Sequence, residues 1–198
     1  MNTATTPQIA TPEIHVPDFG GRPRRINLDM IVAVKGHGKL VVRPIRLEDE
    51  QEMVRFHSRL SDESIYHRYF EYLGLDRRTS HERLCRICTN TPESYAVVVE
   101  RTLTPHHPAA ILAVGRLTKT SETFVATFDT LMMDDLKGPQ LGKILLKRLI
   151  TLAHAFGFHA LTSELLVDDH DNLNLCRALG FACQTLPEDG LVKVTIDL

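Results

Sequence analysis

Apolar side chains recur at helical spacing in one long segment of the second half of the chain. They lie at i, i+4, i+8, i+11 and i+15, which is one face of a helix, and are Leu141, Leu145, Leu149, Leu152 and Phe156. Pro139 suits the first position of this helix, and Gly157 suits the residue just past its end. The pattern therefore predicts a long amphipathic helix between Pro139 and Gly157.

Shorter apolar runs predict strands and further helices around that helix. The strands cover residues 31–34, 40–42, 95–99, 110–117, 124–133, 161–166, 182–186 and 192–197, and the helices cover 47–60, 61–73, 80–88 and 169–179. The strands at 124–133 and 161–166 flank the long helix, so we expect them to be parallel and joined by a right-handed crossover. The order predicts an α/β fold with a mixed, mostly antiparallel sheet and flanking helices.

The length favours one domain with an N-terminal extension. The chain has 198 residues, more than one typical domain and less than two. Residues 1–25 are rich in Thr and Pro with few large apolar groups, so we expect a mobile extension or an arm that orders against a partner subunit of a homodimer. Residues 26–198 are expected to form a single domain.

Composition narrows the partners and the compartment. Lys and Arg number 23 against 25 Asp and Glu, so the chain lacks the excess of cations that binding to nucleic acid requires. No apolar run is long enough to span a membrane, and the first residues do not resemble a secretory signal. Four cysteines are too few for a disulfide scaffold. We therefore expect a cytoplasmic protein with reduced thiols that binds neither nucleic acid nor membrane.

The start of the long helix has the composition of an anion site. A predicted strand runs into a turn with Gly138 and Gly142, followed at once by Lys143. Backbone N–H groups in the first turn of a helix are unpaired and carry partial positive charge, so a phosphate can bind there. An ordinary capped helix start explains the turn equally well. A nucleoside-triphosphate P-loop is excluded, because only three residues separate the glycines and Ile144 follows the lysine.

This turn and its surroundings resemble the GNAT superfamily of acetyl-CoA-dependent N-acetyltransferases. The pyrophosphate loop of that family reads Gln/Arg-x-x-Gly-x-Gly/Ala, and its place is taken here by Lys137-Gly138-Pro139-Gln140-Leu141-Gly142. Lys137 replaces the Gln or Arg, and Gln140 replaces the first Gly. The end of the family's last helix is matched by Leu179-Gly180-Phe181.

The resemblance extends over about residues 39–198. The family's opening strand and helix start are matched by Val42-Arg43-Pro44-Ile45-Arg46 with Asp49. Residues 58–70 look like the helix pair of the bacterial protein-lysine acetyltransferase branch. The resemblance implies a GNAT-like sheet whose parallel strand pair splays at the cofactor site.

The resemblance also implies a set of contacts to acetyl-CoA, which is the co-substrate. Backbone groups of Leu131, Met132 and Met133 are expected along the pantetheine arm. The pyrophosphate is expected at the amides of the turn, which run through Lys137, Gly138, Pro139, Gln140, Leu141, Gly142 and Lys143. Asp169 stands where the family often has an Asn that binds the pantetheine side.

The catalytic positions depart from the family. Thr127 stands where the related branch has a general-base Glu, and threonine cannot act as a base at neutral pH. Asp129 lies two residues further on the same face of the strand, and Glu164 lies on the parallel neighbour, so either carboxylate is a candidate base. Cys176 occupies the position of the family's general-acid Tyr; it is a candidate acid or a small packing residue.

Two other clusters invite a metal interpretation. Cys85 and Cys88 lie near His81, but no second pair of ligands stands at zinc spacing, so we expect these cysteines to pack a helix. Residues 168–171 lack the spacing of a calcium loop and suit an acidic helix start. We expect no bound metal.

Two functions from different classes remain after the sequence is read. The first is an N-acetyltransferase that moves acetyl from acetyl-CoA to an amine of a protein, a peptide or a small molecule by direct attack, with general acid and base help. The second is a non-catalytic acyl-CoA-binding regulatory module, which the altered loop and Thr127 favour.

Overall fold

The computed structural model describes residues 29–34, 38–102, 109–136 and 139–198. Its strands are β1 (Met30–Val34), β2 (Gly38–Pro44), β3 (Ser94–Arg101), β4 (Ala110–Lys119), β5 (Val125–Met132), β6 (Ala160–Leu166), β7 (Ala182–Leu186) and β8 (Leu191–Asp197). Its helices are α1 (Glu50–Ser58), α2 (Asp62–Tyr69), α3 (Leu75–Arg78), α4 (His81–Ile87), α5 (Pro139–Ala155) and α6 (His170–Ala178). The predicted N-terminal extension, residues 1–25, lies outside the described residues.

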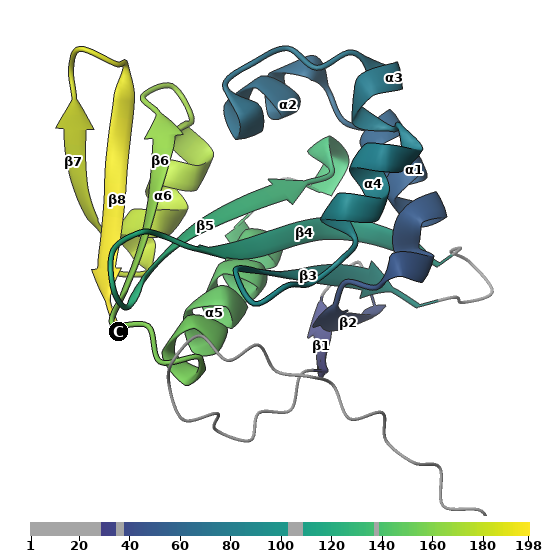
Figure 1. The fold of residues 1–198 in the computed structure, drawn as a ribbon, viewed down its shortest axis with the longest axis horizontal. Coiled ribbons are helices and arrows are strands. Elements are labelled where there is room, and N and C mark those ends of the chain that lie inside the picture. Colours follow the sequence, from purple (N-terminus) through teal and green to yellow (C-terminus); the bar gives the residue numbers. More distant parts are fainter. Residues whose placement is uncertain (1–28, 35–37, 103–108, 137–138) are drawn as a thin grey trace, which may run out of the picture.

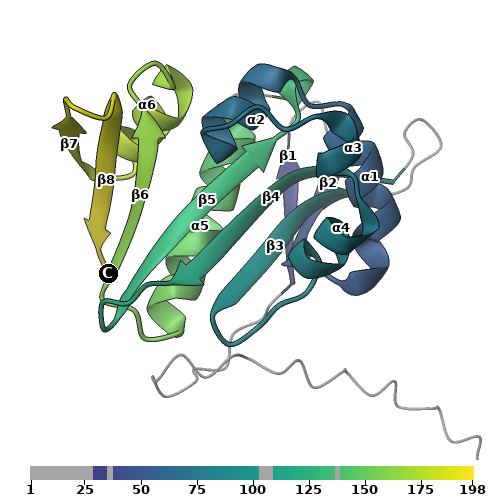
Figure 2. The same cartoon turned by 45° about the horizontal axis from the view of Figure 1, so that its top comes forward.

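The strands form one sheet of order β1-β2-β3-β4-β5-β6-β8-β7. Every neighbouring pair is antiparallel except β5 and β6, which are parallel and joined through α5. Helices α1 to α4 cover one face of the sheet, and α5 and α6 lie on the other (Figures 1 and 2). The predicted class of fold, its parallel pair and its crossover helix are confirmed. Within the described residues, no helix combines the length and the apolar character needed to cross a bilayer.

The parallel pair separates soon after it begins. The β5–β6 ladder covers Val125–Thr127 against Ala160–Thr162 only. Beyond it, β5 remains paired to β4 and β6 remains paired to β8, so the two strands diverge while each keeps its other neighbour. Figures 1 and 2 show β6, β8 and β7 turning away from β5 above this point. The splay implied by the family resemblance is thus present.

Two predicted helices differ from those in the structure. The segment 47–60 is a 3-10 helix at Leu47–Asp49 followed by α1, and the predicted helix 61–73 ends at Tyr69. Phe70 takes a left-handed conformation with φ of 55°, which ends α2 and turns the chain into the short α3. Apolar periodicity continues through this bend, so periodicity alone could not place the end. Ser61 caps the start of α2, where its hydroxyl accepts a hydrogen bond from the Ser64 N–H.

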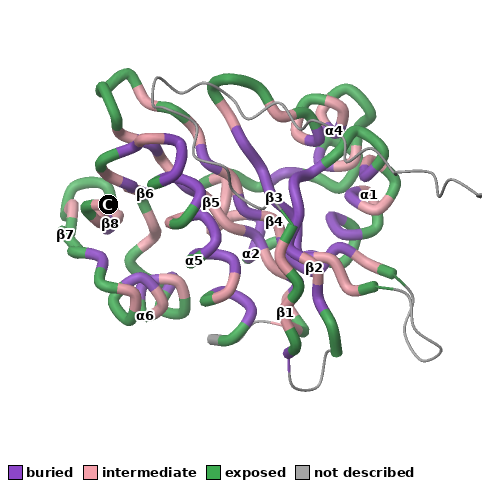
Figure 3. Tube along the Cα trace, turned by 90° about the horizontal axis from the view of Figure 1, so that it is seen from below, coloured by how far each residue is buried: buried purple, intermediate pink, exposed green. Residues whose placement is uncertain are grey.

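The predicted apolar face of α5 is buried against the sheet. Leu145, Leu149 and Leu152 are fully buried, and Figure 3 shows the buried stretches of α5 beside those of the central strands. Gly115 of β4 permits this approach, because a Cβ there would lie 2.9 Å from Cδ1 of both Leu145 and Leu149. The tight packing of α5 on β4 fixes the position of the helix start relative to β5.

A buried ion pair joins β2 to the start of the first helical segment. Arg43 donates from Nη1 and Nη2 to Oδ2 and Oδ1 of Asp49 at 2.8 and 2.7 Å, and from Nε to Glu100 at 2.7 Å. Asp49 also accepts the Arg46 N–H at 2.8 Å. Burial by itself lowers the pKa of Arg43, but the hydrogen bonds to both carboxylates outweigh it and raise that pKa. Arg43 and Asp49, two of the residues that carry the family resemblance, therefore have a structural role: they connect β2 to the first helical segment.

His57 of α1 is a buried imidazole, 1% exposed, and neither ring nitrogen has a hydrogen-bond partner among the described residues. Burial lowers its pKa from 6.5 to about 4, and the positive charges of Arg83, Arg78 and Arg68 add to the effect. The folded protein therefore keeps His57 neutral at a pH where the unfolded chain protonates it.

We expect this histidine to make the protein sensitive to acid. The unfolded state binds more protons between pH 6.5 and about 4, so the stabilisation is complete above pH 6.5 and is lost as the pH falls. From about pH 7.5 to about pH 5 the loss should be about 2 kcal/mol of unfolding free energy. Urea unfolding at both pH values should show this loss in wild type and not in His57→Phe. His154→Phe, a change at an exposed histidine, is the control and should keep the wild-type loss. If His57→Phe lost as much unfolding free energy between the two pH values as wild type does, the assignment would be contradicted.

Candidate active site

A cleft of about 1110 Å³ opens where β5 and β6 separate. Its walls come from α2, β5, β6, α6 and the start of α5. Charged side chains from five of these elements face it, among them Glu63, Arg68, Asp129, Lys143, Glu164 and Asp168. The cleft joins the predicted phosphate site to a polar helix on the far side of the sheet.

The start of α5 lies at one end of the cleft. The helix begins at Pro139, as predicted, and the exposed Lys143 lines the cleft from its first turns. Gln140 is exposed, whereas Lys137 and Gly138 lie outside the described residues. A helix start of this kind presents unpaired backbone N–H groups. The predicted binding of a pyrophosphate here stays a prediction that the position of Lys143 supports.

Gly142 and Leu141 have packing roles. Leu141 is buried in the core. A Cβ at Gly142 would lie 2.9 Å from Cδ2 of Leu175 and 3.3 Å from Cε of Met132. The missing side chain therefore lets α5 pack closely on α6 and β5. This need for close packing explains the glycine without any ligand.

The free edge of β5 forms the floor of the cleft. Leu131 and Met132 line it, as the resemblance implies. Met133 is buried and donates its N–H to Leu112 O at 3.0 Å, so this amide is engaged by β4. Among the described residues, the ladder to β6 stops at Thr127 and Thr162. The backbone beyond Thr127 can therefore pair with amide groups of an extended ligand, as an added strand does.

Asp169 is both a helix cap and part of the cleft wall. Asp169 is only 5% exposed. Its side chain accepts hydrogen bonds from the Asn172 N–H at 3.3 Å and from Asn172 Nδ2 at 2.8 Å. These bonds satisfy one of the unpaired donors at the start of α6. The carboxylate is thus held in place beside the cleft, where the resemblance expects a contact to pantetheine.

The two candidate bases lie on opposite walls in different surroundings. Asp129 forms an ion pair with Arg68, Oδ2 to Nη2 at 2.5 Å, and stands opposite Arg116 in the β4–β5 ladder. A proton taken up by Asp129 would weaken both attractions. Glu164 is exposed and faces Lys193 in the β6–β8 ladder.

Cys176 lies in the wall on the α6 side and is buried. Burial, followed by the neighbouring Cys183 and Asp169, raises the pKa of its thiol to about 12. A free thiol has a pKa near 8.5, so transfer of a proton from Cys176 to an ordinary thiolate is uphill by about three pKa units. These surroundings favour packing over the role of general acid.

Helix α2 supplies cleft residues that the sequence analysis did not single out. The side chain of His67 lines the cleft and is 19% exposed. Its Nε2 atom lies 3.7 Å from Asp168 Oδ1, and its Nδ1 atom lies 3.9 Å from Asp169 Oδ2. Asp134, just before α5, accepts hydrogen bonds from the Ser61 N–H at 2.7 Å and from the Ser64 hydroxyl at 2.5 Å. The loop before α5 is therefore tied to the helix that carries His67.

The two cysteines Cys85 and Cys88 differ in burial and in surroundings. Cys88 is buried, and burial raises its pKa to about 12. Cys85 instead lies with His81 and Glu50, where the donor atoms fall within 4.8 Å of one another and His81 Nδ1 is 2.6 Å from Glu50 Oε1. A structural zinc site takes four ligands, and this group offers three. The absence of a metal stays a prediction.

The chain resembles known acetyltransferases in sequence and in fold. No protein-family model matches the chain. A curated acetyltransferase of Pseudomonas aeruginosa is 28% identical over 153 residues, which is 76% of this chain and 78% of the relative. The crystal structure of the GNAT domain of S. lividans PAT superposes with a TM-score of 0.73 at 23% identity, covering 86% of this chain and 97% of that domain.

A second solved structure shares the arrangement with its ligands present. The spermidine N-acetyltransferase of Vibrio cholerae, in complex with CoA and spermine, has a TM-score of 0.62 at 16% identity over 80% of this chain and 95% of its own. The fold that these likenesses define is the GNAT fold, and this chain has it. The fold implied by the resemblance of its sequence is confirmed.

Proposed function

We propose that the protein transfers an acetyl group from acetyl-CoA to a primary amine. One observation carries the proposal: a single cleft runs from the start of α5, through the free edge of β5, to the polar face of α2. It offers a phosphate site at one end, an edge for amide groups in the middle and charged side chains at the other end. These are the three surfaces that acetyl-CoA and an amine require.

The chain's own groups fit the cofactor in a definite order. Lys143 and the amides at the start of α5 would hold the pyrophosphate, because helix starts bind anions. The edge of β5 from Phe128 to Met132 would pair with the amides of the pantetheine arm. Acetyl-CoA supplies the activated acetyl group.

The amine must be neutral to attack, so a group in the cleft must take its proton. We propose His67 for this role, because imidazole is the commonest side chain in acid–base catalysis and this ring faces the cleft beside Asp168 and Asp169. Asp129 and Glu164 remain the candidates from the sequence. The nitrogen bonds to the acetyl carbon, the carbon–sulfur bond breaks, and the thiolate takes up a proton.

The second candidate function is an acyl-CoA-binding module without turnover. Thr127 favours it, because its hydroxyl is bonded to Thr118 O at 3.3 Å and offers no base. Both functions require acetyl-CoA in the same cleft. Only the transferase forms an acetylated product. A mass-spectrometric assay for acetylated amine over a panel of amines and peptides therefore distinguishes the two functions.

Binding of acetyl-CoA should depend on Lys143. Lys143→Glu should raise the dissociation constant at least tenfold, about 1.4 kcal/mol, because it places a negative charge beside the pyrophosphate. Lys147→Glu, one turn further along α5 and exposed but not part of the cleft wall, is the matched control. Substitution of Gly142 is a poorer test, because a side chain there meets Leu175. Equal calorimetric affinities in wild type and Lys143→Glu would contradict the assignment.

A further inference from the structure

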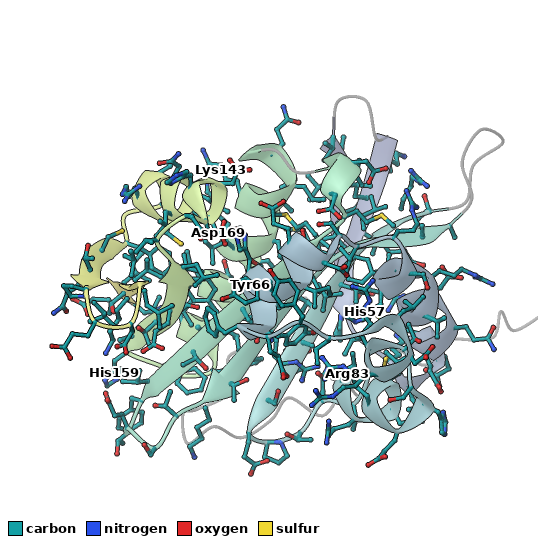
Figure 4. The ribbon with its side chains drawn as sticks, turned by 90° about the horizontal axis from the view of Figure 1, so that it is seen from above. His57, Tyr66, Arg83, Lys143, His159 and Asp169 are labelled. Carbon is teal, nitrogen blue, oxygen red and sulfur yellow. The ribbon has the colours of Figure 1, made fainter. Side chains whose placement is uncertain are left out.

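A second cavity, of about 360 Å³, lies beside the cleft, bounded by α1, α2, α4, β4 and β5. Arg68, Asp129 and Leu131 line both cavities, so the Arg68–Asp129 ion pair stands between them. Figure 4 shows His57 and Arg83 of this second cavity on one side of Tyr66, with Lys143 and Asp169 on the other. The cavity is therefore next to the amine end of the cleft and away from the phosphate end.

Its lining is strongly cationic, and we call it the arginine pocket after Arg68, Arg83, Arg86 and Arg116. The one carboxylate among its described lining residues is Asp129, and that group is already paired with Arg68. Like charges at such close quarters repel one another unless an anion compensates them. The pocket thus has three more cations than anions while His57 is neutral.

Three of the four arginines also contact uncharged partners. The guanidinium carbons of Arg68 and Arg83 each lie 4.7 Å from the centre of the Tyr69 ring. Arg116 donates to Ser94 Oγ at 2.7 Å and to the carbonyl of Ile87. These contacts orient the positive groups without neutralising them. An array held this way is preorganised for an anionic ligand.

Polar atoms in the pocket also lack partners. Both ring nitrogens of His57 and Nε of Arg83 are buried and make no hydrogen bond among the described residues. His57 is 1% exposed, so these groups are removed from bulk water. Unsatisfied buried groups of this kind cost stability and in native proteins mark a place where a ligand or a bound water belongs.

We propose that the arginine pocket binds a carboxylate of the acceptor, so that the substrate is a small amine that also carries an acidic group. This inference rests on the proposed function and names its substrate class. Arginine guanidinium groups match the planar geometry of a carboxylate. The pocket holds the acid while the amine reaches across the Arg68–Asp129 pair into the cleft. The acetyl group moves to the amine nitrogen, the thiolate leaves, and the carboxylate is unchanged.

The first test measures the pocket without any turnover. Succinate, which carries carboxylates and no amine, is titrated calorimetrically into the full-length protein. We expect binding that weakens at least tenfold in Arg83→Gln and in Arg86→Gln, two variants chosen because neither removes the partner of Asp129. Arg77→Gln, an exposed arginine paired with Glu71 outside the pocket, should bind as wild type does. No binding to wild type, or equal binding by all four proteins, would overturn the proposal.

The second test measures turnover. With acetyl-CoA, 4-aminobutyrate should have a kcat/KM at least tenfold above that of 4-aminobutanamide, which has an amide in place of the carboxylate. Arg83→Gln should reduce this preference. Similar values for both amines in wild type would overturn the inference. Failure of the proposed function is separate: no amine would then be acetylated, while succinate would still report on the pocket.

Discussion

Replacing His67 by glutamine should lower kcat by about 100-fold while leaving the affinity for acetyl-CoA nearly unchanged. Glutamine keeps the approximate size of the imidazole and can form hydrogen bonds, but it cannot take up the proton of the attacking amine. The ring lies in the cleft near the carboxylates of Asp168 and Asp169, just before α6, and these would stabilise the imidazolium that the proposed reaction forms. Steady-state kinetics with the best amine of the panel, together with calorimetry, measure both quantities.

Two matched variants separate His67 from the candidates that the sequence supplied. Glu164→Gln should retain wild-type kcat, because this carboxylate is exposed and faces Lys193. Asp129→Asn removes the partner of Arg68, so it should raise KM for the amine more than it lowers kcat. A fall of 100-fold in Asp129→Asn with full activity in His67→Gln would return the role of base to Asp129.

Replacing Asp49 by alanine should lower the free energy of unfolding by about 3 to 5 kcal/mol, since it leaves the buried Arg43 guanidinium without its bidentate partner. The same change removes the acceptor of the Arg46 N–H at the start of the 3-10 helix. Chemical denaturation measures the effect. If Asp49→Ala does not fold, Asp49→Asn should fold with an intermediate loss.

An exposed ion pair provides the control for this effect. Glu71 pairs with Arg77 at 3.5 Å, and both side chains are more than half exposed. Glu71→Ala should change stability by less than about 0.5 kcal/mol, because water and salt screen such pairs. Equal losses in Asp49→Ala and Glu71→Ala would contradict the structural role given to the buried pair.

The parts of the fold that follow a local rule could be predicted from the sequence. The apolar face of α5, its start at Pro139 and the parallel β5–β6 pair all follow from spacing or from turn chemistry, and the structure confirms them. The end of α2 at Tyr69 could not be predicted, because apolar residues continue through Phe70 to Leu73.

The candidate site was less accessible to sequence reasoning, because it is made by tertiary contacts. In the sequence, His67 and Arg68 look like part of an ordinary polar helix surface. Only the packing of α2 on β5 brings them to the site. The arginine pocket is bounded by α1, α2, α4, β4 and β5, and no spacing rule links these elements in the sequence. Gly142 shows the opposite case, where a residue suited to a ligand loop has a sufficient reason in packing against Leu175.

The measurement that tests the central claim most directly is hydrogen–deuterium exchange of the full-length protein with and without acetyl-CoA. Binding in the cleft should slow exchange in the free edge of β5, residues 128–132, and in the first turns of α5, and should leave the β1–β2 pair at the far edge of the sheet unchanged. Saturating acetyl-CoA that leaves exchange in β5 and α5 unaltered would contradict the account.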